Sequence, residues 1–244
     1  MKIANIEVTL IDSMGSDLSV VNAARVSFDK ESTWVNKWNE QPIGMDWDIR
    51  GNPLFKLSEK DVKLINYLAK HKHFSPFNHA FLSFRVKAPI FVARQLVKHK
   101  FMPWNEISRR YVDSEPEFYM PNQYRLKADN VKQGSSEEET DKFINPWGYK
   151  ECEINAVHKQ HIEACFTMYK GLLDSGICPE QARMVLPQNT MTEWAWSGSL
   201  GAFLDMLVLR LDPHTQKETQ EVAKLIAKHV EQLFPVSYNA RINN

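Results

Sequence analysis

The chain has 244 residues with 30 basic and 30 acidic side chains, so it lacks the excess positive charge that large nucleic-acid-binding surfaces need. Since 43% of its residues are hydrophobic and 11% aromatic, it can bury a large core, which excludes global disorder. No apolar run approaches the ~20 residues that cross a bilayer, and the start lacks a signal-peptide core, so we expect a soluble cytoplasmic protein.

The first third of the chain predicts strands and helices separated by a long loop. Apolar and polar residues alternate over 2–11 as they do in a strand, and the apolar residues of 18–26 have the spacing of a short helix. Residues 30–57 contain three Trp without clean periodicity, which predicts a long structured loop. Ser58, three residues before an acidic residue, resembles a capping box and predicts a helix that ends near His71.

The middle of the chain predicts a strand followed by a helix. Residues 80–86 have strand character, and Pro89 suits the first turn of a helix over residues 90–100, which Pro103 would end. Residues 105–110 are then expected to form a loop or short turn that folds back over the last residues of this helix.

The last part of the chain is mostly helical in its periodicity. Residues 128–147 are polar and predict a mobile surface excursion. The predicted elements that follow are an amphipathic helix over 151–173 stopped by Gly176, a short helix opened by Pro179, a strand over 190–196, a buried helix over 200–209, and a final helix opened by a second capping box of Thr215 with Glu218.

This mixed order of helices and strands has no regular βαβ alternation, which predicts an α+β fold. Nothing in the length forces a division, so we expect residues 1–244 to form a single domain with surface insertions near 30–57 and 128–147.

The segment over residues 94–111, RQLVKHKFMPWNEISRRY, gathers cations around a single carboxylate, Glu106. A neutral protein that concentrates positive charge in one short stretch indicates a site for an anion, and the alternative is a solvated basic helix face. The cations of this segment are Arg94, Lys98, His99, Lys100, Arg109 and Arg110.

Two further arginines, Arg183 and Arg210, lie within or at the end of apolar helices and therefore need partners. Structural ion pairs with Glu180, Glu106 or Asp212 are one possibility. The other is a phosphate or a heterocycle carbonyl, which the planar guanidinium fits well.

Metal ligation and thiol chemistry are not predicted. His71, His73 and His79 lack an i, i+4 helical pair or a Cys partner, so packing, capping or ring stacking is favoured over zinc binding. Cys178 has no adjacent base to lower its pKa, which favours a buried spectator thiol. The glycine-rich phosphate-binding motifs are absent, so a phosphate would be held by side chains and helix termini.

The central segment resembles the signature of the flavin-dependent thymidylate synthases, which is Arg-His-Arg, seven residues and Ser. Here Lys98-His99-Lys100 is followed by seven residues and Ser108, within NEISRRY. The lysine-bearing motif is similar to viral members, which would place the protein in a host cytoplasm. Further phrases similar to family members are KHKHFSPFNH (70–79), VKAPIFVARQ (86–95), EFYMP (117–121), PEQARMVLP (179–187) and RLDPHTQKE (210–218).

The resemblance implies a reductive methylation of dUMP to dTMP, with 5,10-methylenetetrahydrofolate as the carbon donor and NADPH reducing bound FAD. It implies no metal, no membrane and no nucleic-acid partner. It also implies a central, mostly antiparallel sheet flanked by helices, and a homotetramer whose active sites lie where subunits meet.

The resemblance also implies site residues, position by position. Arg210 matches an arginine that helps ionise the uracil ring, and with Ser108 it is the implied catalytic pair. The implied dUMP-binding residues are Gln95, Leu96, Val97, Lys98, Glu106, Ile107, Ser108, Arg109, Arg110, Arg183 and Arg210. The implied FAD-binding residues are His73, Ser75, Lys98, His99, Lys100, Glu106, Ser199 and Asp205.

Several positions depart from the family pattern. Lys98 and Lys100 replace arginines, which keeps the charge but loses the bidentate fork. Ser199 and Gly201 stand where the family often has Asn and Arg, and Asp205 stands at a further position that contacts the flavin in the family. These departures leave open a variant one-carbon transfer, such as hydroxymethylation of a pyrimidine deoxynucleotide. A nucleic-acid-binding protein is the remaining, non-enzymatic alternative.

Overall fold

The computed structural model describes every residue except 113, 130–133, 146–147, 149 and 244. Its centre is an antiparallel sheet of β2 (Glu7–Met14), β5 (Phe81–Pro89), β12 (Met191–Ser199) and β6 (Trp104–Glu106), in that order. The two central strands pair along their whole length, from Phe81 opposite Ser199 to Pro89 opposite Met191. The expected α+β fold with an antiparallel central sheet is therefore confirmed.

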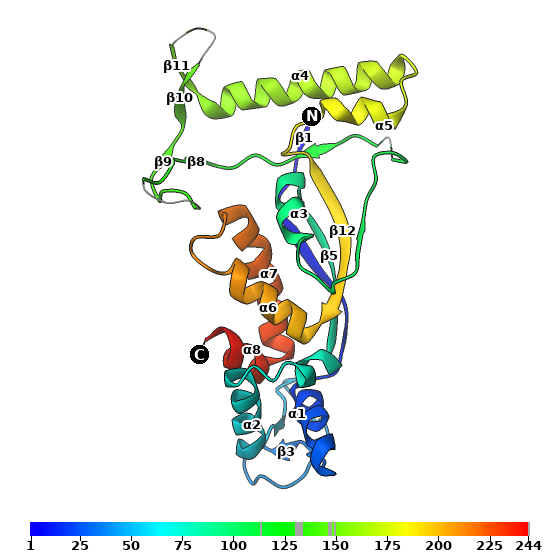
Figure 1. Ribbon diagram of the computed structural model, residues 1–244, viewed down its shortest axis with the longest axis vertical. Helices are drawn as coiled ribbons and strands as arrows, with labels where there is room; N and C mark the ends of the chain where they lie inside the picture. Colours follow the sequence, from blue (N-terminus) through cyan, green and yellow to red (C-terminus); the bar gives the residue numbers. More distant parts are fainter. Residues whose placement is uncertain (113, 130–133, 146–147, 149, 244) are drawn as a thin grey trace.

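The described part of the chain adds eight helices and several short strands, which lie beside the sheet and beyond both of its ends (Figure 1). The helices are α1 (Asp17–Arg25), α2 (Glu59–Lys70), α3 (Ile90–Leu96), α4 (Ile154–Asp174), α5 (Pro179–Ala182), α6 (Leu200–Arg210), α7 (Lys217–Leu233) and α8 (Pro235–Ile242). The short strands are β1 (Lys2–Ile3), β3 (Val35–Asn36), β4 (Phe55–Lys56), β7 (Glu117–Phe118), β8 (Tyr124–Arg125), β9 (Glu139–Thr140), β10 (Lys142–Asn145) and β11 (Lys150–Glu153).

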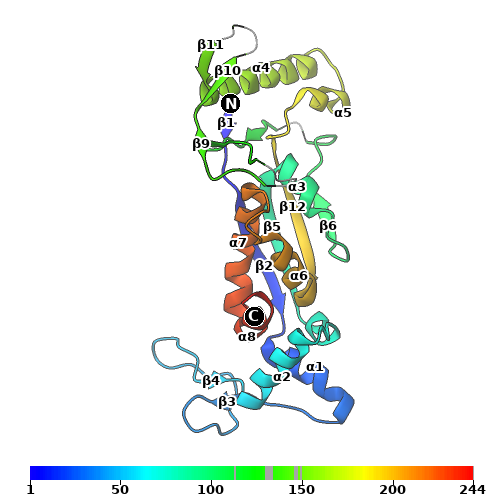
Figure 2. The same cartoon turned by 60° about the vertical axis from the view of Figure 1, so that its left-hand side comes forward.

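The core lies between the sheet and the C-terminal helices α6 and α7, which run along one face of the sheet (Figure 2). Alternate residues of β5, among them Phe84 and Val86, are fully buried, as are Trp194 and Trp196 of β12. The period of two along each strand thus turns one set of side chains to the helices. Two of the seven Trp therefore serve core packing.

The helix predicted over residues 90–100 is shorter than expected. It ends at Leu96, and the chain then makes turns through Phe101, whose backbone is left-handed at φ 62°. Residues 104–106, of which the last two were predicted to be part of a loop, instead form β6 at the edge of the sheet. The ring of Trp104 stacks on Trp194 at 4.3 Å between centroids, so tertiary packing decides this strand.

Of the two predicted capping boxes, the first forms only the Ser58 cap, because the Asp61 carboxylate accepts from the Ser58 hydroxyl, and the second is wrong. The Asp61 main-chain N–H donates to the Ser58 hydroxyl at 3.3 Å, and α2 begins directly after Ser58. Thr215 instead donates to the main-chain oxygen of Leu209 at 2.9 Å, and Gln216 occupies the position before α7. The Glu218 side chain accepts from Arg125 rather than reaching back to the cap.

The structure shows part of the two predicted surface insertions. Residues 30–57 form a long excursion held by β3 and β4, with the rings of Trp34 and Trp47 edge-on to Phe55. Of the predicted excursion over 128–147, residues 130–133 and 146–147 lie outside the described residues, and the described part includes β9 and β10. Helix α4 ends at Asp174, and Gly176, which was predicted to stop it, follows with a φ of 79°. Within the described chain, no helix is long and apolar enough to cross a membrane.

Candidate active site

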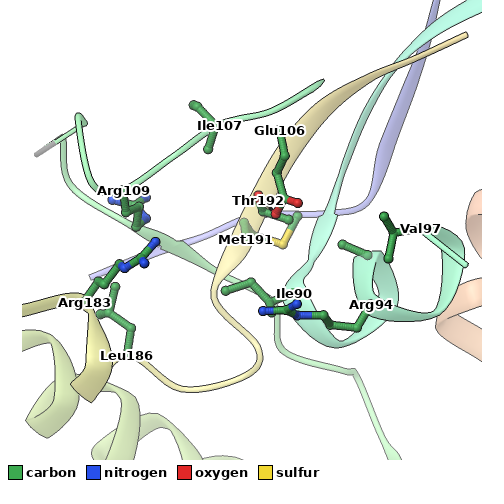
Figure 3. Close-up of a pocket in the computed structure, with 11 residues that line it drawn as sticks. Ile90, Arg94, Val97, Glu106, Ile107, Arg109, Arg183, Leu186, Met191 and Thr192 are labelled. Carbon is green, nitrogen blue, oxygen red and sulfur yellow. Dashed lines mark hydrogen bonds between the residues drawn. The ribbon is translucent and has the colours of Figure 1, made fainter. Parts of the chain in front are cut away.

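A first cavity of about 210 Å³ opens between α3, β6 and the turn after α5 (Figure 3). It is smaller than the roughly 300 Å³ at which pockets for whole drug-sized ligands begin, so on its own it suits one end of a ligand. Its lining residues are Ile90, Ala93, Arg94, Val97, Glu106, Ile107, Arg109, Arg183, Leu186, Met191 and Thr192.

Three arginines from three separate elements line this cavity. Arg94 comes from α3, Arg109 from the loop after β6, and Arg183 from the turn that follows α5. The Arg183 Nε donates to the main-chain oxygen of Glu180 at 3.3 Å, and Arg109 donates to the main-chain oxygen of Ser114 at 2.9 Å. Main-chain acceptors leave the positive charges uncompensated, which favours an anionic ligand.

Glu106 is the carboxylate of the same cavity, and both of its oxygens are held. Thr192 donates to Oε1 at 2.7 Å, and the Trp104 indole N–H donates to Oε2 at 3.1 Å. Figure 3 shows the Glu106 carboxylate beside Thr192, apart from the guanidinium groups of Arg109 and Arg183. A carboxylate fixed in this way can accept hydrogen bonds from a ligand without competing for the arginines.

A second cavity, of about 510 Å³, lies beyond the end of α3. Val97 lines the first cavity and His99 the second, so the two flank the same turn of chain. The second cavity is lined by Phe74, Asn78, Phe81, His99, Lys100, Phe101, Met102, Ser199, Gly201, Ala202 and Asp205.

The wall of the second cavity at the start of α6 is closely fitted. The Ser199 hydroxyl donates to the Asn78 side-chain oxygen at 2.6 Å and accepts from the Ala202 main chain at 3.2 Å, which caps the helix. A Cβ on Gly201 would come within 2.5 Å of that Asn78 oxygen. Asn78 therefore fills the space that a side chain at position 201 would occupy.

Arg210 is bonded to His99 in the interior next to the second cavity. Its Nε donates to the His99 Nε2 at 3.0 Å, and its Nη2 lies 3.5 Å from the main-chain oxygen of Gln95. Burial and the Arg210 charge lower the pKa of His99 to about 4, and burial also lowers the pKa of Arg210. His99 is thus a neutral acceptor that holds the Arg210 guanidinium in place.

Gln95 joins the same cluster from α3. Its amide is hydrogen-bonded to Gln216, and its oxygen accepts from Thr219 at 3.1 Å, both at the start of α7. Gln95 and Arg210 therefore line neither cavity, although both belong to one hydrogen-bonded cluster with His99.

The other residues implied by the resemblance are distributed around the two cavities. Arg110 donates to the Ser108 hydroxyl at 3.2 Å just past the first cavity, while Lys98 is exposed. The Leu96 side chain is fully buried in the core, so contact with a ligand would have to come through its main chain. His73 and Ser75 are exposed and flank Phe74 at the second cavity.

The ion pairs considered for the two isolated arginines are not what the structure shows. Arg183 meets the main chain of Glu180 and not its carboxylate, and Arg210 meets His99. Asp212 accepts from His214 at 3.0 Å, and Glu106 is held by Thr192 and Trp104.

The histidine and cysteine predictions have mixed outcomes. The ring of His71 packs on Tyr67 at 4.3 Å, as the stacking alternative predicted. Cys178 is exposed, so its predicted burial is wrong; it precedes the short helix α5, where few residues cover it. The described residues contain no group of three His, Cys, Asp or Glu side chains arranged to hold a metal ion.

Among the cavity residues that were not assigned a role from the sequence, three contribute a charge, an amide or an aromatic wall. Arg94 was recognised as part of the basic segment, and its spacing one turn before Lys98 was the available signal. Asn78 and Phe74 belong to a phrase similar to family members, but only the fold places them against α6.

Comparisons with known proteins agree on one family. Residues 9–236 match the family described as thymidylate synthase complementing protein. The flavin-dependent thymidylate synthase of Kosmotoga olearia is 36% identical over 236 residues, which cover 97% of this chain and 90% of the relative. That of Thermus thermophilus is 35% identical over 96% of this chain and 74% of the relative.

Solved structures support the same fold. The chain is similar to the UMP/dUMP methylase PolB of Streptomyces cacaoi bound with 5-Br dUMP, with a TM-score of 0.74, 30% identity, and coverage of 98% of this chain and 96% of that chain. The PolB structure bound with 5-Br UMP gives a TM-score of 0.73 at 30% identity, covering 98% of this chain and 95% of that chain. By its sequence and its fold, this chain belongs to the flavin-dependent thymidylate synthases, the methyltransferases that make dTMP.

Proposed function

We propose that the first cavity binds dUMP by its phosphate and that the second cavity binds FAD. The observation that carries this assignment is the meeting of Arg94, Arg109 and Arg183 around a space too small for a dinucleotide. Three forked cations suit a phosphate dianion, which accepts several charge-assisted hydrogen bonds. The larger second cavity, with aromatic walls from Phe74 and Phe81, suits a flat ring system.

The residues of the second cavity fit a flavin. Lys100 supplies a cation, Ser199 a hydroxyl, and Phe101 an exposed ring beside them. The close backbone approach at Gly201 keeps this wall flat, because a side chain there would collide with Asn78. FAD bound here would supply the reducing equivalents for the methylation.

The remaining chemistry belongs to the side chains of this chain. Arg94, Arg109 and Arg183 would hold the nucleotide phosphate, and Glu106 would accept hydrogen bonds from the nucleotide. Arg210 lines neither cavity but is held by neutral His99 at the turn that both flank, so it would supply a fixed positive charge to a uracil ring that reaches from the first cavity to this turn. Ser108, bonded to Arg110, would orient the nucleotide.

We further propose 5,10-methylenetetrahydrofolate as the carbon donor and NADPH as the reductant, in a homotetramer with active sites at subunit interfaces. The small size of the first cavity supports a site that a second subunit completes.

The proposal is tested by anaerobic turnover of the purified protein with FAD, NADPH, the folate and dUMP. We expect dTMP, identified by mass, as the product. A hydroxymethylated product would instead support the variant one-carbon transfer, and the absence of any modified nucleotide would contradict the proposal.

UMP is a second candidate substrate, because the structures to which the chain is similar are those of a UMP/dUMP methylase. A comparison of kcat/KM for UMP and dUMP separates the two. A preference for dUMP supports the main proposal, and equal values support a dual specificity.

A further inference from the structure

An ion pair between α6 and α8 lies at the edge of the second cavity. The Nη2 of Arg241 donates to the Asp205 carboxylate at 2.7 Å, and its guanidinium carbon lies 5.2 Å from the centre of the Phe74 ring. Asp205 and Phe74 both line the second cavity. Two of its wall residues therefore fix the position of this guanidinium.

The hydrogen-bonding capacity of Arg241 is only partly used. Its side chain is 23% exposed, and its Nε is buried without a hydrogen-bond partner among the described residues. A guanidinium carries five N–H donors, and a buried donor without an acceptor is costly. The buried Nε cannot reach a ligand, so any donor that Arg241 offers to the third cavity comes from the exposed part of its side chain.

Arg241 also lines a third cavity, of about 550 Å³, between α2 and α8. The other charged residues that line it are Lys70 and Lys72, and no carboxylate is among the lining residues. Because Arg241 is paired with Asp205, Lys70 and Lys72 supply the remaining positive charge, which favours an anion over a neutral ligand. Because Arg241 contacts Asp205 and Phe74, the third cavity adjoins the second.

Resting on the proposed binding of FAD in the second cavity, we propose that Arg241, Lys70 and Lys72 bind the diphosphate of FAD. FAD is a dinucleotide, so it reaches beyond the space that holds its ring, and its diphosphate carries two negative charges. Asp205 and Phe74 act as positioning residues for Arg241. The same ion pair explains how a carboxylate can stand in the wall of a site for an anionic cofactor, since Arg241 neutralises its charge.

Equilibrium binding of FAD and of riboflavin, which has no phosphate, tests this inference by flavin fluorescence. We expect Arg241→Gln to raise the Kd for FAD about tenfold, which corresponds to about 1.4 kcal/mol, and to leave the Kd for riboflavin unchanged, because a charge-assisted contact to the diphosphate is lost. Lys72→Asn should act in the same direction, since Asn tolerates the left-handed backbone at φ 57° while removing the cation.

Two controls sharpen the experiment. Lys228→Gln removes an exposed cation from α7 that lines none of these cavities, and it should change neither Kd. Arg241→Lys keeps the charge but not the fork, so it should bind FAD better than Arg241→Gln does. Thermal unfolding of each variant shows whether it is folded.

Unchanged FAD binding in folded Arg241→Gln would overturn the inference, as would an equal loss of FAD and riboflavin. Lys100→Gln tests the flavin assignment separately, because Lys100 lines the second cavity. If Lys100→Gln leaves both flavins bound as tightly as the native chain does, the assignment of the second cavity fails and this inference fails with it. If it weakens both while Arg241→Gln weakens neither, the diphosphate site alone is wrong.

Discussion

The charge state of His99 links a single residue to the stability of the protein. Its folded pKa of about 4 lies below the ordinary value of 6.5, so the folded protein resists protonation there. The resulting stability is fully present above pH 6.5 and is lost as the pH falls toward 4. We expect the free energy of unfolding to fall by about 1–3 kcal/mol across this window on account of His99. Urea denaturation at several pH values measures it, and an identical pH dependence in His99→Gln would contradict this origin.

Arg210 provides a second prediction at this scale. We expect Arg210→Gln to stay folded and to bind FAD, but to lose methylation by about a hundredfold or more, because a fixed charge at the reacting ring is removed. The pKa of His99 should rise toward 6.5 in this variant, since one of the groups that lower it is gone. NMR titration of the imidazole measures the pKa. Global unfolding of the variant would show that Arg210 is mainly structural.

The sequence indicated which residues carry charge, but not all of their partners. Lys98 to Lys100 and Arg210 were singled out, yet the bond from Arg210 to His99 joins residues 111 positions apart. Such a contact depends on the packing of α6 against the end of α3, which no local pattern encodes. For the same reason Arg210 meets His99 rather than an acidic partner, whereas Arg183 meets the nearby main chain of Glu180 instead of its carboxylate.

At the scale of elements, the start of α6 depends on the absence of a side chain at position 201. A Cβ there would lie 2.5 Å from the Asn78 oxygen, which is itself bonded to Ser199. We expect Gly201→Ala to lower the free energy of unfolding by about 1–2 kcal/mol, since Asn78 must move and its hydrogen bond is lost.

The double variant Asn78→Ala with Gly201→Ala tests the cause. With the Asn78 amide removed, the added methyl group has room, and alanine favours the helix over glycine by about 1 kcal/mol. The penalty for Gly201→Ala should therefore vanish in the Asn78→Ala background. The same penalty in both backgrounds, measured by thermal unfolding, would show that Asn78 is not responsible.

Elements with strong local signals were predicted well, and those decided by tertiary contacts were not. The cap at Ser58, the stop at Gly176 and the buried helix α6 follow from local chemistry. Strand β6 was missed because only three residues pair, and they do so through the stacking of Trp104 on β12. Helix α3 ends at Leu96, although the sequence predicts a helix to residue 100, because the chain turns there between the two cavities.

For the whole molecule, the long helix α4 bears on the proposed homotetramer. Ile162 and Tyr169 are its buried residues, whereas Met168 is 56% exposed and Met184 nearby is 74% exposed. Figure 1 shows α4 lying across one end of the molecule with α5 beneath it. Exposed apolar side chains on an amphipathic helix are typical of a surface that another subunit covers.

We therefore expect light scattering to give the mass of a tetramer. Met168→Glu should shift the assembly toward smaller species and lower the turnover number, because a charge at an apolar interface is costly. Glu163→Gln on the same helix is the matched control, since Glu163 is exposed and polar already. A monomer with full activity would contradict the tetramer.

Paired binding measurements on Arg183→Gln and Lys100→Gln test most directly the central claim, that two cavities flanking one turn serve two ligands. We predict that Arg183→Gln raises the Kd for dUMP about tenfold and keeps FAD binding, while Lys100→Gln weakens FAD and keeps dUMP binding. If either variant weakened both ligands equally, or if neither changed its own ligand, the assignment of one ligand to each cavity would be contradicted.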